Sequence, residues 1–400
     1  MRDRRVLFVG GGIVWIAAVV VGLAGRGDAS GTDPVPELAS AMAAEEPADD
    51  AGTASPASTT TVAVDQRPSA PLTGLATDLD PSRPALAVKI DDSDPAAHPP
   101  IGVADADRVY VEMVEGGTTR MLAVFWSTDP ALVGPVRSGR STDAAILGEL
   151  GEPLLAMSGA NEVFLSQLAS APLVDLRWDA APGAYDELDG VPSPYRLVAD
   201  PATLRTAAAE RGSAPPAALT WRDPSDVPAG TPLEAAEIRY SGGGRVVRWT
   251  WDPAASADAA EDAAAGAGGG VWRRSIGDRA HTDADGRALT AANVVVQRVP
   301  YVDTGLVDPA GSSVPEAELV GSGEVLVLTA GGAVEGTWSK ASAAASTELF
   351  TTDGEPIALD PGTTWFELVP TSGDVARIAT VGTGADADGA LPNAGSEPLD

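Results

Sequence analysis

Apolar and polar residues follow different patterns along this chain of 400 residues, and each pattern predicts a different kind of structure. The first is an uncharged run, residues 6–25, which follows Arg2, Arg4 and Arg5. A helix needs about 20 such residues to cross a bilayer, whereas the apolar core of a secretory signal has about 7 to 15. The length favours an uncleaved signal anchor, and the small residues at Gly22-Leu-Ala24 keep a cleaved signal peptide open as the alternative.

The end of this run has the layout of a bacterial lipoprotein signal. Residues 23–26 read Leu-Ala-Gly-Arg, and Arg26 stands where the lipidated cysteine of such a signal would be. The chain contains no cysteine, so a thioether-linked lipid has no attachment point. Because positive residues precede the run and an acidic chain follows it, we predict that residues 27–400 lie outside the cytoplasm. The protein is then single-pass with its C-terminus outside, or secreted if the signal is cleaved.

Period-two and continuous apolar runs predict strands in two later regions, and longer apolar stretches predict helices. In the first region, residues 71–200, we expect strands at 86–90 and 109–114 and helices at 144–150 and 162–168. The second region, residues 233–370, has strand-like runs at 294–296 and 325–328 and turn pairs at Asp285-Gly286 and Asp353-Gly354. The pattern predicts an α+β fold of two domains, a mixed α/β N-terminal domain and a strand-rich C-terminal domain. A connection with one short helix, residues 201–232, joins them.

Three further segments lack the large apolar residues that a packed core requires. They are the spacer at residues 26–70, an insert at 253–270 and the tail at 371–400, all rich in Ala, Gly, Ser, Thr, Pro and acids. Such segments bury too little surface to offset the entropy lost on ordering, so we predict that they are disordered.

The charge of the chain limits its partners. A formal net charge of -31 argues against nucleic acid or an anionic membrane surface as the main partner, since both would repel the chain. Without cysteine, neither disulfides nor thiol chemistry are available. No motif indicates a cofactor. We expect the membrane as partner through residues 6–25 if the signal is kept, and an anionic envelope ligand or an envelope protein besides.

The most concrete local prediction is a hairpin over residues 109–127. Two apolar runs flank Gly116-Gly117, which is typical of a two-residue turn. In that register Glu115 faces Thr118 and Met113 faces Arg120, so that Glu115 and Arg120 become diagonal neighbours. The pair is then either a structural salt bridge at the hairpin end or part of a binding site.

On the same register Glu112 lies on an otherwise apolar face, where burial would raise the pKa of its carboxyl. Of the 26 basic residues only two are lysines, Lys89 and Lys340. Lys89 shares a strand face with Ala87 and Asp91 and is a candidate partner for Glu112 if the strands pair. The alternative is a lysine on a solvated strand face. Glu112 and Lys89 are the candidates for catalysis.

A second candidate site is the loop Gly134-Pro-Val-Arg-Ser-Gly-Arg-Ser-Thr-Asp143, which precedes a predicted helix. Ser141 or Thr142 can cap that helix, and its free backbone donors together with Arg137 and Arg140 suit a carboxylate or phosphate. We predict a ligand site from Arg137, Arg140, Ser141, Arg120 and Glu115. The equally open alternative is internal pairing of the arginines with nearby acids.

Other catalytic and metal motifs are weak. The two histidines, His98 and His281, lie far from any G-x-S-x-G motif, and His98 is placed in a Pro-rich loop. Asp283 and Asp285 resemble part of a calcium loop but lack the later acidic ligand, and a hairpin turn explains them as well. They are only a weak metal candidate, and we predict no firm metal site.

The strand, hairpin and arginine-loop segments described above, with several segments of the second region, resemble the YerB-like family of bacterial extracytoplasmic lipoproteins. The N-terminal likeness lies in Pro71-Leu-Thr-Gly-Leu75, Ala87-Val-Lys-Ile-Asp91, Val114-Glu-Gly-Gly117, Thr119-Arg120, Gly134-Pro-Val-Arg-Ser138 and Arg140. The C-terminal likeness lies in Asn293-Val-Val-Val-Gln297, Gly321-Ser-Gly-Glu324, Trp338 and residues 362–365. The resemblance implies a two-domain α+β protein of unknown function, and it confers no reaction. Where relatives tend to read Pro-His-Asn-Leu, this chain has Pro194-Tyr-Arg-Leu197.

Three functions remain open from the sequence. The leading one is a non-enzymatic envelope module that binds a ligand or partner through the arginine loop and the hairpin. The second is an envelope hydrolase or transferase with Glu112 as an acid of raised pKa. The third is a structural envelope protein whose charges only hold its domains together. An open cleft lined by Glu112, Lys89, Arg120, Arg137 and Arg140 would favour the first two, and closed mutual pairing would favour the third.

Overall fold

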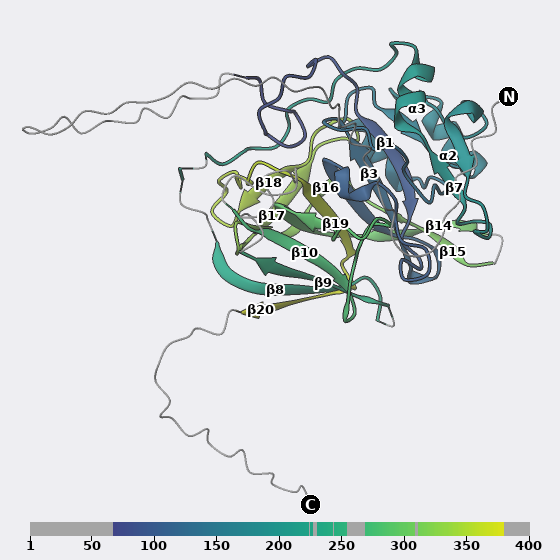
Figure 1. The fold of residues 1–400 in the computed structure, drawn as a ribbon. Coiled ribbons are helices and arrows are strands. Elements are labelled where there is room, and N and C mark those ends of the chain that lie inside the picture. Colours follow the sequence, from purple (N-terminus) through teal and green to yellow (C-terminus); the bar gives the residue numbers. More distant parts are fainter. Residues whose placement is uncertain are drawn as a thin grey trace, which may run out of the picture. The chain divides into compact units, whose positions relative to one another are not determined.

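Strands dominate the described part of the chain in the computed structural model analysed for this protein (Figure 1). The structure describes residues 67–223, 225–226, 230–242, 244–253, 269–308 and 311–379. Most of its strands belong to one mixed sheet in the order β11-β10-β9-β8-β17-β16-β13-β19-β2-β3-β1-β4-β5. Three more strands join at its sides, where β12 pairs with β10, β18 with β17 and β20 with β8.

The N-terminal region supplies one end of this sheet. Its strands are β1 Leu86–Asp91, β2 Arg108–Met113, β3 Thr119–Phe125, β4 Leu154–Ala156 and β5 Val174–Asp175, with a separate pair β6 Tyr185–Glu187 and β7 Leu197–Ala199. The described α-helices are α1 Thr142–Gly148, α2 Glu162–Leu168 and α3 Pro201–Ala208, and short 3-10 turns are η1 Val103–Asp105, η2 Glu115–Gly117 and η3 Pro182–Ala184. The predicted strands and helices of this region are therefore present, as is the short helix in the connection, although α1 begins and ends two residues before the predicted range of 144–150.

The C-terminal region supplies the other end. Its sheet strands are β8 Thr231–Arg239, β9 Val246–Asp252, β10 Val271–Ile276, β11 Arg279–Ala280, β12 Thr290–Ala291, β13 Asn293–Val299, β16 Gly321–Thr329, β17 Gly332–Lys340, β18 Glu348–Thr351, β19 Thr364–Pro370 and β20 Asp374–Ala379. Strands β14 Tyr301–Val307 and β15 Ser313–Ala317 form a separate two-stranded ribbon. The strand-rich character predicted for this region is confirmed.

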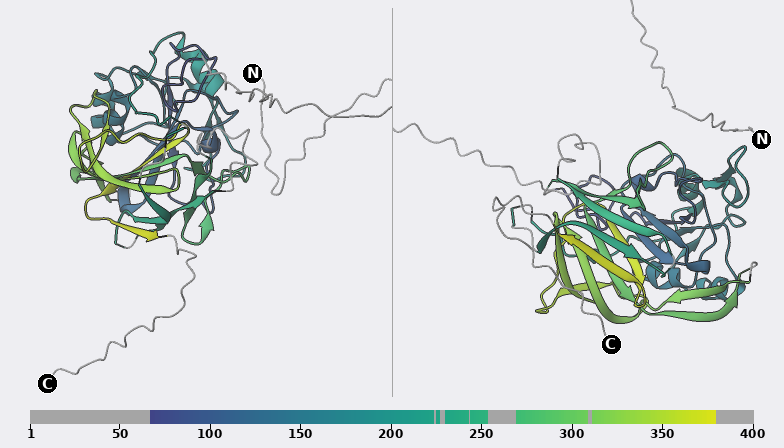
Figure 2. Two further views of the ribbon diagram at one scale, coloured as in Figure 1. Left: turned by 90° about the vertical axis from the view of Figure 1, so that its left-hand side faces the viewer. Right: turned by 90° about the horizontal axis from the view of Figure 1, so that it is seen from below.

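Strand β19 joins the two regions. It pairs in parallel with β13 of its own region and in parallel with β2 of the N-terminal region, with Trp365 beside Val109 and Glu367 beside Val111. Figures 1 and 2 show the green and yellow strands of the C-terminal region beside the blue strands of the N-terminal region, and the two sets meet where β19 pairs with β2. The two predicted domains thus share one sheet, and the boundaries between them remain a prediction.

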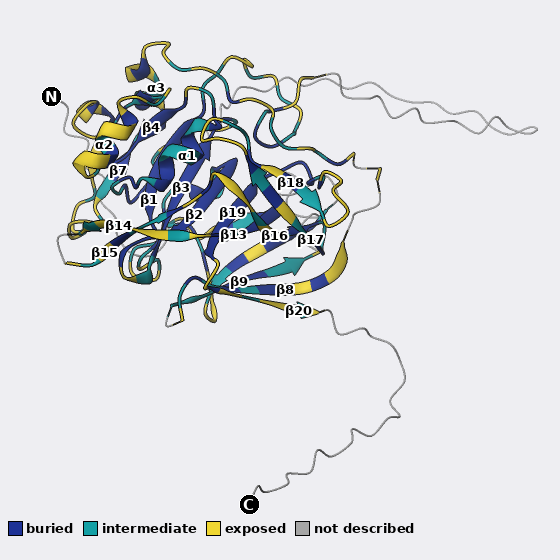
Figure 3. Ribbon diagram, turned by 180° about the vertical axis from the view of Figure 1, so that it is seen from behind, coloured by how far each residue is buried: buried dark blue, intermediate teal, exposed yellow. Residues whose placement is uncertain are grey.

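The central strands are covered on both faces, which explains their continuous apolar sequences. One face packs Val88, Val109 and Ala123 against the aromatic residues Trp249 and Trp365. The other face packs Tyr110, Leu122 and Phe366 under α1, whose Ile146 and Leu147 are buried. In Figure 3 β1 to β3 are mostly in the dark blue of buried residues, while much of α2 and of β14 is yellow. A charged residue in β1 or β2 is therefore forced into an enclosed site.

The predicted register of the β2–β3 hairpin is wrong by one residue. The turn contains three residues, Glu115 to Gly117, with Gly116 and Gly117 in left-handed conformations (φ 69° and 72°). Strand pairing places Arg120 opposite Glu112 and places Met113 opposite Thr119. One extra turn residue moves every β3 side chain to the other face. Arg120 therefore joins Glu112 on the face under α1, and it is not the diagonal partner of Glu115.

Several predictions fall on residues outside the described ranges. The predicted anchor at residues 6–25, most of the spacer, residues 254–268 of the insert and residues 380–400 all lie there. The start of the tail, predicted as disordered from residue 371, instead forms β20 and pairs with β8, so that prediction is wrong for residues 374–379. Among the residues that the structure does describe, no helix is both long enough and apolar enough to span a bilayer.

Candidate functional site

Lys89 and Glu112 meet inside the protein. Lys89 in β1 and Glu112 in β2 flank the central strand β3, and the Lys89 ammonium donates a hydrogen bond to Glu112 Oε1. The same ammonium lies 2.7 Å from Oδ1 of Asp143 in α1. All three residues are at most 1% exposed. Of the two interpretations left open, the Lys89–Glu112 contact is confirmed and the solvated lysine is wrong, although the contact spans β3 and does not arise from direct pairing of β1 with β2.

The carboxyl of Glu112 has a raised pKa, because burial disfavours its charge and Asp143 adds repulsion, while Lys89 only partly opposes both. Its Oε2 is buried without a hydrogen-bond partner in the described part of the chain. Asp143 is the residue that the sequence analysis missed here. Asp143 directly follows the Arg140-Ser-Thr segment, in the first turn of a helix, and this position was the signal that could have placed it in the site.

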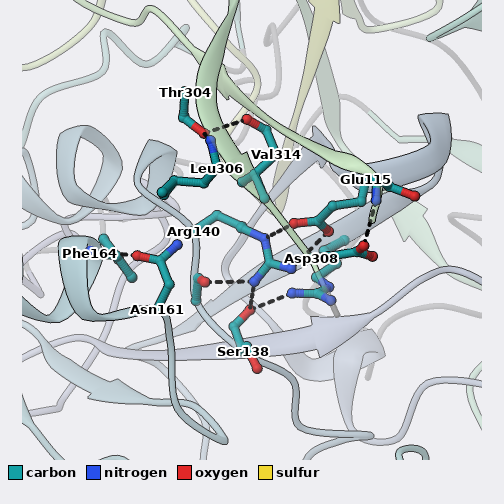
Figure 4. Close-up of polar contacts among 12 residues, drawn as sticks. Glu115, Ser138, Arg140, Asn161, Phe164, Thr304, Leu306, Asp308 and Val314 are labelled. Atoms are coloured by element: carbon teal, nitrogen blue, oxygen red, sulfur yellow. Dashed lines mark hydrogen bonds and ion pairs between the residues drawn. The ribbon is translucent and has the colours of Figure 1, made fainter. Parts of the chain in front are cut away.

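Arg140 is held by an acid of the hairpin (Figure 4). Its Nε and Nη2 donate to the two carboxylate oxygens of Glu115 at 2.7 and 2.8 Å, and its Nη1 donates to the Gly139 carbonyl. Burial would raise the pKa of Glu115, but the hydrogen bonds and charge of Arg140 outweigh it and lower that pKa. This bidentate pair is the internal alternative to a ligand at Arg140.

The loop after Arg140 does not form the predicted helix cap. Ser141 makes no capping hydrogen bond through its side chain, and Thr142 Oγ1 instead accepts a bond from Ala317 N at 3.0 Å. The backbone N–H of Arg140 donates to Asp143 Oδ2 at 2.8 Å. Two backbone donors of its first turn, Asp143 N and Ala144 N, bind the carbonyls of Arg140 and Ser141. An anion site at the helix start therefore remains a prediction.

Arg137 lies closer to solvent than Arg140. It forms an ion pair with Asp91, the last residue of β1, and its side chain is 17% exposed. Its guanidinium lies 5.5 Å from the centre of the Tyr195 ring, and that ring stacks on His98 with centroids 3.9 Å apart. Tyr195 is the residue that stands where relatives tend to carry histidine. His98, expected as an isolated loop residue, is therefore part of a stack beside an arginine.

Arg120 differs from its neighbours in having no carboxylate of its own. Within the described residues no ion pair of 4.0 Å or less includes Arg120, and its Nη1 donates to the Ser138 carbonyl at 2.7 Å. Two acids lie opposite it in the flanking strands, but Asp91 is paired with Arg137 and Glu112 with Lys89. Burial and the charges of Arg140 and Arg137 lower the pKa of Arg120 to about 10.

The predicted residues therefore converge, and most of them satisfy one another. We call this set the arginine cluster; it consists of Lys89, Asp91, Glu112, Glu115, Arg120, Arg137, Arg140 and Asp143. The cluster holds four cations and four carboxylates, yet Lys89 is shared by two carboxylates and Arg120 is left with a carbonyl alone. The closed pairs are the arrangement that favours a structural role, and Arg120, beside the partly exposed Arg137, is the member of the cluster without a carboxylate partner.

A second buried network was not predicted from the sequence. Arg274 in β10 lies 3.2 Å from Glu367 in β19 and 3.5 Å from Asp92, which directly follows β1. Arg274 also donates to Nδ1 of His281, which leaves the proton of this imidazole on Nε2. Burial and Arg274 lower the pKa of His281 to about 3. A charged residue within an apolar strand, as in Trp365-Phe-Glu-Leu368, was the signal that such a network existed.

The carboxylates of Asp283 and Asp285, the weak calcium candidate, are already bound by groups of the chain. Both carboxylate oxygens of Asp283 lie 3.3 Å from backbone nitrogens, those of Val103 and Ala104, and Asp285 pairs with Arg287. Thr282 and Ala288 form a bridge across the turn, so the hairpin interpretation of this segment is confirmed. Over the described ranges, no group of three or more His, Asp or Glu residues is placed to hold a metal ion. Burial raises the pKa of Asp283 to about 7.

The fold and this cluster define a strand-rich protein in which an N-terminal and a C-terminal region share one sheet. Residues 72–214 match the family described as "Protein of unknown function (DUF3048) N-terminal domain", and residues 265–366 match its C-terminal domain. The chain belongs to this family. The resemblance seen in the sequence is thereby confirmed.

Two comparisons with relatives agree with this assignment. The chain is 42% identical over 71 residues to a protein of Bacillus subtilis (strain 168) named "Putative lipoprotein YerB", a match that spans 22% of that protein and 18% of this chain. A crystal structure of the YerB protein from Bacillus subtilis superimposes with a TM-score of 0.62 over 78% of this chain and 100% of that one, at 22% identity. The structural match shows a common fold and nothing about activity.

Proposed function

We propose that this chain is a non-enzymatic module of the cell envelope that binds a ligand carrying a carboxylate or phosphate group. The group would lie against the guanidinium groups of Arg120, at the start of β3, and of Arg137, in the segment between β3 and α1. The observation that carries the proposal is the state of Arg120: an enclosed cation, crowded by two other arginines, with every nearby carboxylate engaged elsewhere.

The chemistry of the site suits an oxyanion. A guanidinium presents several N–H donors in a fixed plane and binds carboxylates and phosphates in two-pronged geometry. Arg120 is 8% exposed and the Arg137 side chain 17%, so the ligand group that we propose is one of a few atoms and not part of a large polymer. Arg140 and Glu115, which the sequence analysis placed among the ligand residues, hold each other and position the loop that carries Arg137.

The location outside the cytoplasm is part of this proposal. It is supported by the positively charged start, the apolar run at residues 6–25 and the acidic remainder, and by the printed name of the Bacillus subtilis relative, which includes the word lipoprotein. We further propose that the uncleaved run anchors the protein. Sequencing the N-terminus of the mature protein tests the anchor: a start at Gly25 would show cleavage and a secreted product, whereas an intact run in the membrane fraction supports it.

The hydrolase alternative is less well supported. Glu112 has the raised pKa that a general acid needs, but it is 1% exposed and its neighbours are Lys89 and Asp143. A general acid must lie within hydrogen-bond reach of the bond it acts on. In this structure a substrate has no such access to Glu112.

Isothermal titration calorimetry tests the binding proposal. Sodium phosphate and sodium acetate would be titrated at constant ionic strength into the wild-type chain and into the variants Arg120→Met and Arg211→Met. Arg211 is an exposed arginine that also donates only to carbonyl oxygens, so its variant removes the same charge without the crowding. We expect saturable binding of at least one anion to the wild type and to Arg211→Met, and its loss in Arg120→Met. Equal binding by all three proteins would refute the site.

A further inference from the structure

A groove that contains no residue of the arginine cluster lies between helix α2 and the β14–β15 ribbon. It has a volume of about 270 Å³. One wall is formed by α2 and its cap, with Asn161, Val163, Phe164 and Gln167, and the other by the ribbon, with Val302, Thr304, Leu306, Glu316 and Glu318. Ser141, just before α1, also lines it. Figure 4 shows Asn161 and Phe164 on one side and Thr304 and Leu306 on the other. The groove therefore brings together segments of the N-terminal and C-terminal regions.

Exposed apolar side chains are concentrated at this groove. Of the five large apolar residues that are strongly exposed in the described part of the chain, Val163 (51%) and Val302 (40%) stand on its opposite walls. Scattered exposed valines are ordinary, but two that face each other across one depression mark a binding surface. The two walls thus form an apolar surface on which an aliphatic side chain can pack.

The ribbon is preformed, and side chains use only part of its outer backbone, for example Gly305 N, which donates to Asp303 Oδ1. The Tyr301 hydroxyl accepts a bond from Met113 N at 3.0 Å and donates to the Leu368 carbonyl at 2.9 Å, and Ala317 N is bound to Thr142. These contacts fix the base of the ribbon against the main sheet. In the described residues β14 and β15 pair only with each other. A ribbon edge of this kind accepts an added strand through backbone hydrogen bonds.

The charge of the groove decides what the added strand carries. Glu316 and Glu318 line it, and none of its lining residues is basic. Since the whole chain has a net charge of -31, a second copy or one of the acidic segments at 27–66 and 380–400 would bring like charges to the groove. An anionic lipid surface would be repelled in the same way. The complementary occupant is a basic one.

We propose that this groove docks an extended segment of a partner protein in which aliphatic residues alternate with lysine or arginine. One aliphatic side chain enters between Val163 and Val302, the flanking cations pair with Glu316 and Glu318, and the backbone extends the ribbon as a further strand. The proposal does not rest on the anion site, because the two surfaces share no residue that contacts a ligand.

Fluorescence anisotropy with synthetic peptides tests the docking proposal. The probe is fluorescein-labelled (Lys-Val)3-amide, compared with (Glu-Val)3-amide, with (Lys-Ser)3-amide and with a (Lys-Val)3 peptide methylated on alternate backbone nitrogens. We expect saturable binding of (Lys-Val)3 alone, since the other peptides lack the charge, the aliphatic side chain or the backbone donors. Absence of saturable binding, or equal binding of any comparison peptide, overturns the proposal.

Matched variants locate the binding on the protein. The pair Val163→Ser with Val302→Ser removes one apolar contact from each wall, and the pair Glu316→Gln with Glu318→Gln removes the charges. Each pair should weaken (Lys-Val)3 binding by about tenfold or more. The controls are Val307→Ser, which is more exposed but does not line the groove, and Glu348→Gln on β18, and both should bind as the wild type does.

Two measurements make these results interpretable. Circular dichroism melting of each variant verifies that it is folded, and all the substituted side chains lie at the surface or half-buried, so we expect unchanged midpoints. Analytical ultracentrifugation of the wild type and of the Val163→Ser, Val302→Ser variant detects self-association. A dimer that is lost in this variant would assign the groove to a second copy and overturn the proposal, as would equal peptide binding by the groove variants and the controls.

Discussion

Replacing Arg120 by methionine should stabilise the protein. A structural arginine that is removed from an enclosed network normally leaves its acids unpaired, at a cost of about 3 to 5 kcal/mol. Arg120 leaves none, because Asp91 keeps Arg137, Glu112 keeps Lys89 and the Ser138 carbonyl keeps a donor in Arg140 at 3.4 Å. The substitution thus removes an enclosed positive charge and leaves no carboxylate or carbonyl group without a hydrogen-bond donor.

The size of the effect follows from the pKa of Arg120. Folding lowers it from 12.5 to about 10, and since one pKa unit corresponds to about 1.4 kcal/mol, the charged form is disfavoured by about 3 kcal/mol. Loss of the hydrogen bond to Ser138 costs about 1 kcal/mol. The net gain is about 2 kcal/mol, which for a protein of this size corresponds to a melting midpoint higher by about 4 °C.

Differential scanning calorimetry of the wild type, Arg120→Met and Arg211→Met in chloride buffer measures this effect. Arg211 is exposed, so its variant should melt within about 1 °C of the wild type. A midpoint for Arg120→Met that lies several degrees below the wild type would show that Arg120 is a structural member of the cluster. Arg120 would then not be a cation held for a ligand.

Other predictions concern the buried carboxylates. Lys89→Met leaves both Glu112 and Asp143 without their cation. It should therefore lower the free energy of unfolding by about 3 to 5 kcal/mol, measured by urea denaturation at neutral pH. A loss below about 1 kcal/mol would contradict the ion-pair assignment. Asp283 has a folded pKa of about 7, raised above its unfolded value of 3.8, so its contribution to stability is present at low pH and is lost as the pH rises through 7. The variant Asp283→Asn should therefore gain stability relative to the wild type by about 1.4 kcal/mol per pH unit between about pH 4 and 7. Urea denaturation across that range checks this, and Asp285→Asn, which removes a half-exposed acid of lowered pKa, should show no such gain. A flat difference for Asp283→Asn would mean that its carboxyl is ionised in the folded protein.

Local elements of the fold could be predicted because apolar runs determine them. The helix expected at residues 162–168 begins and ends where predicted, since Asn161 caps it and Phe164 and Leu168 face the core. Strand β1 was expected for the same reason. Long-range pairing could not be predicted in this way. Nothing in the apolar run of β19 indicates that it enters the sheet between β2 and β13, because that choice depends on packing among segments hundreds of residues apart.

The candidate site was predicted in part. The partnership of Lys89 and Glu112 followed from the rarity of lysine and from one charged position on an apolar strand. The place of Arg120 was missed, because it depends on whether the turn after Glu115 holds two or three residues, and two glycines permit both. The sequence also left internal pairing and ligand binding equally open for the arginine loop. The structure assigns Arg140 to internal pairing, and Arg120 remains with a carbonyl alone.

A crystal of the wild-type protein soaked in sodium selenate provides the most direct test of the anion site. Selenate has the charge and the tetrahedral oxygens of a phosphate-like group, and its selenium gives an anomalous signal that locates the anion independently of the protein density. We predict an anomalous peak within about 4 Å of the guanidinium groups of Arg120 and Arg137, the distance at which direct ionic partners lie. A soaked crystal with selenate bound elsewhere, or with no peak at Arg120, would contradict the proposal that this arginine is held for an anionic ligand.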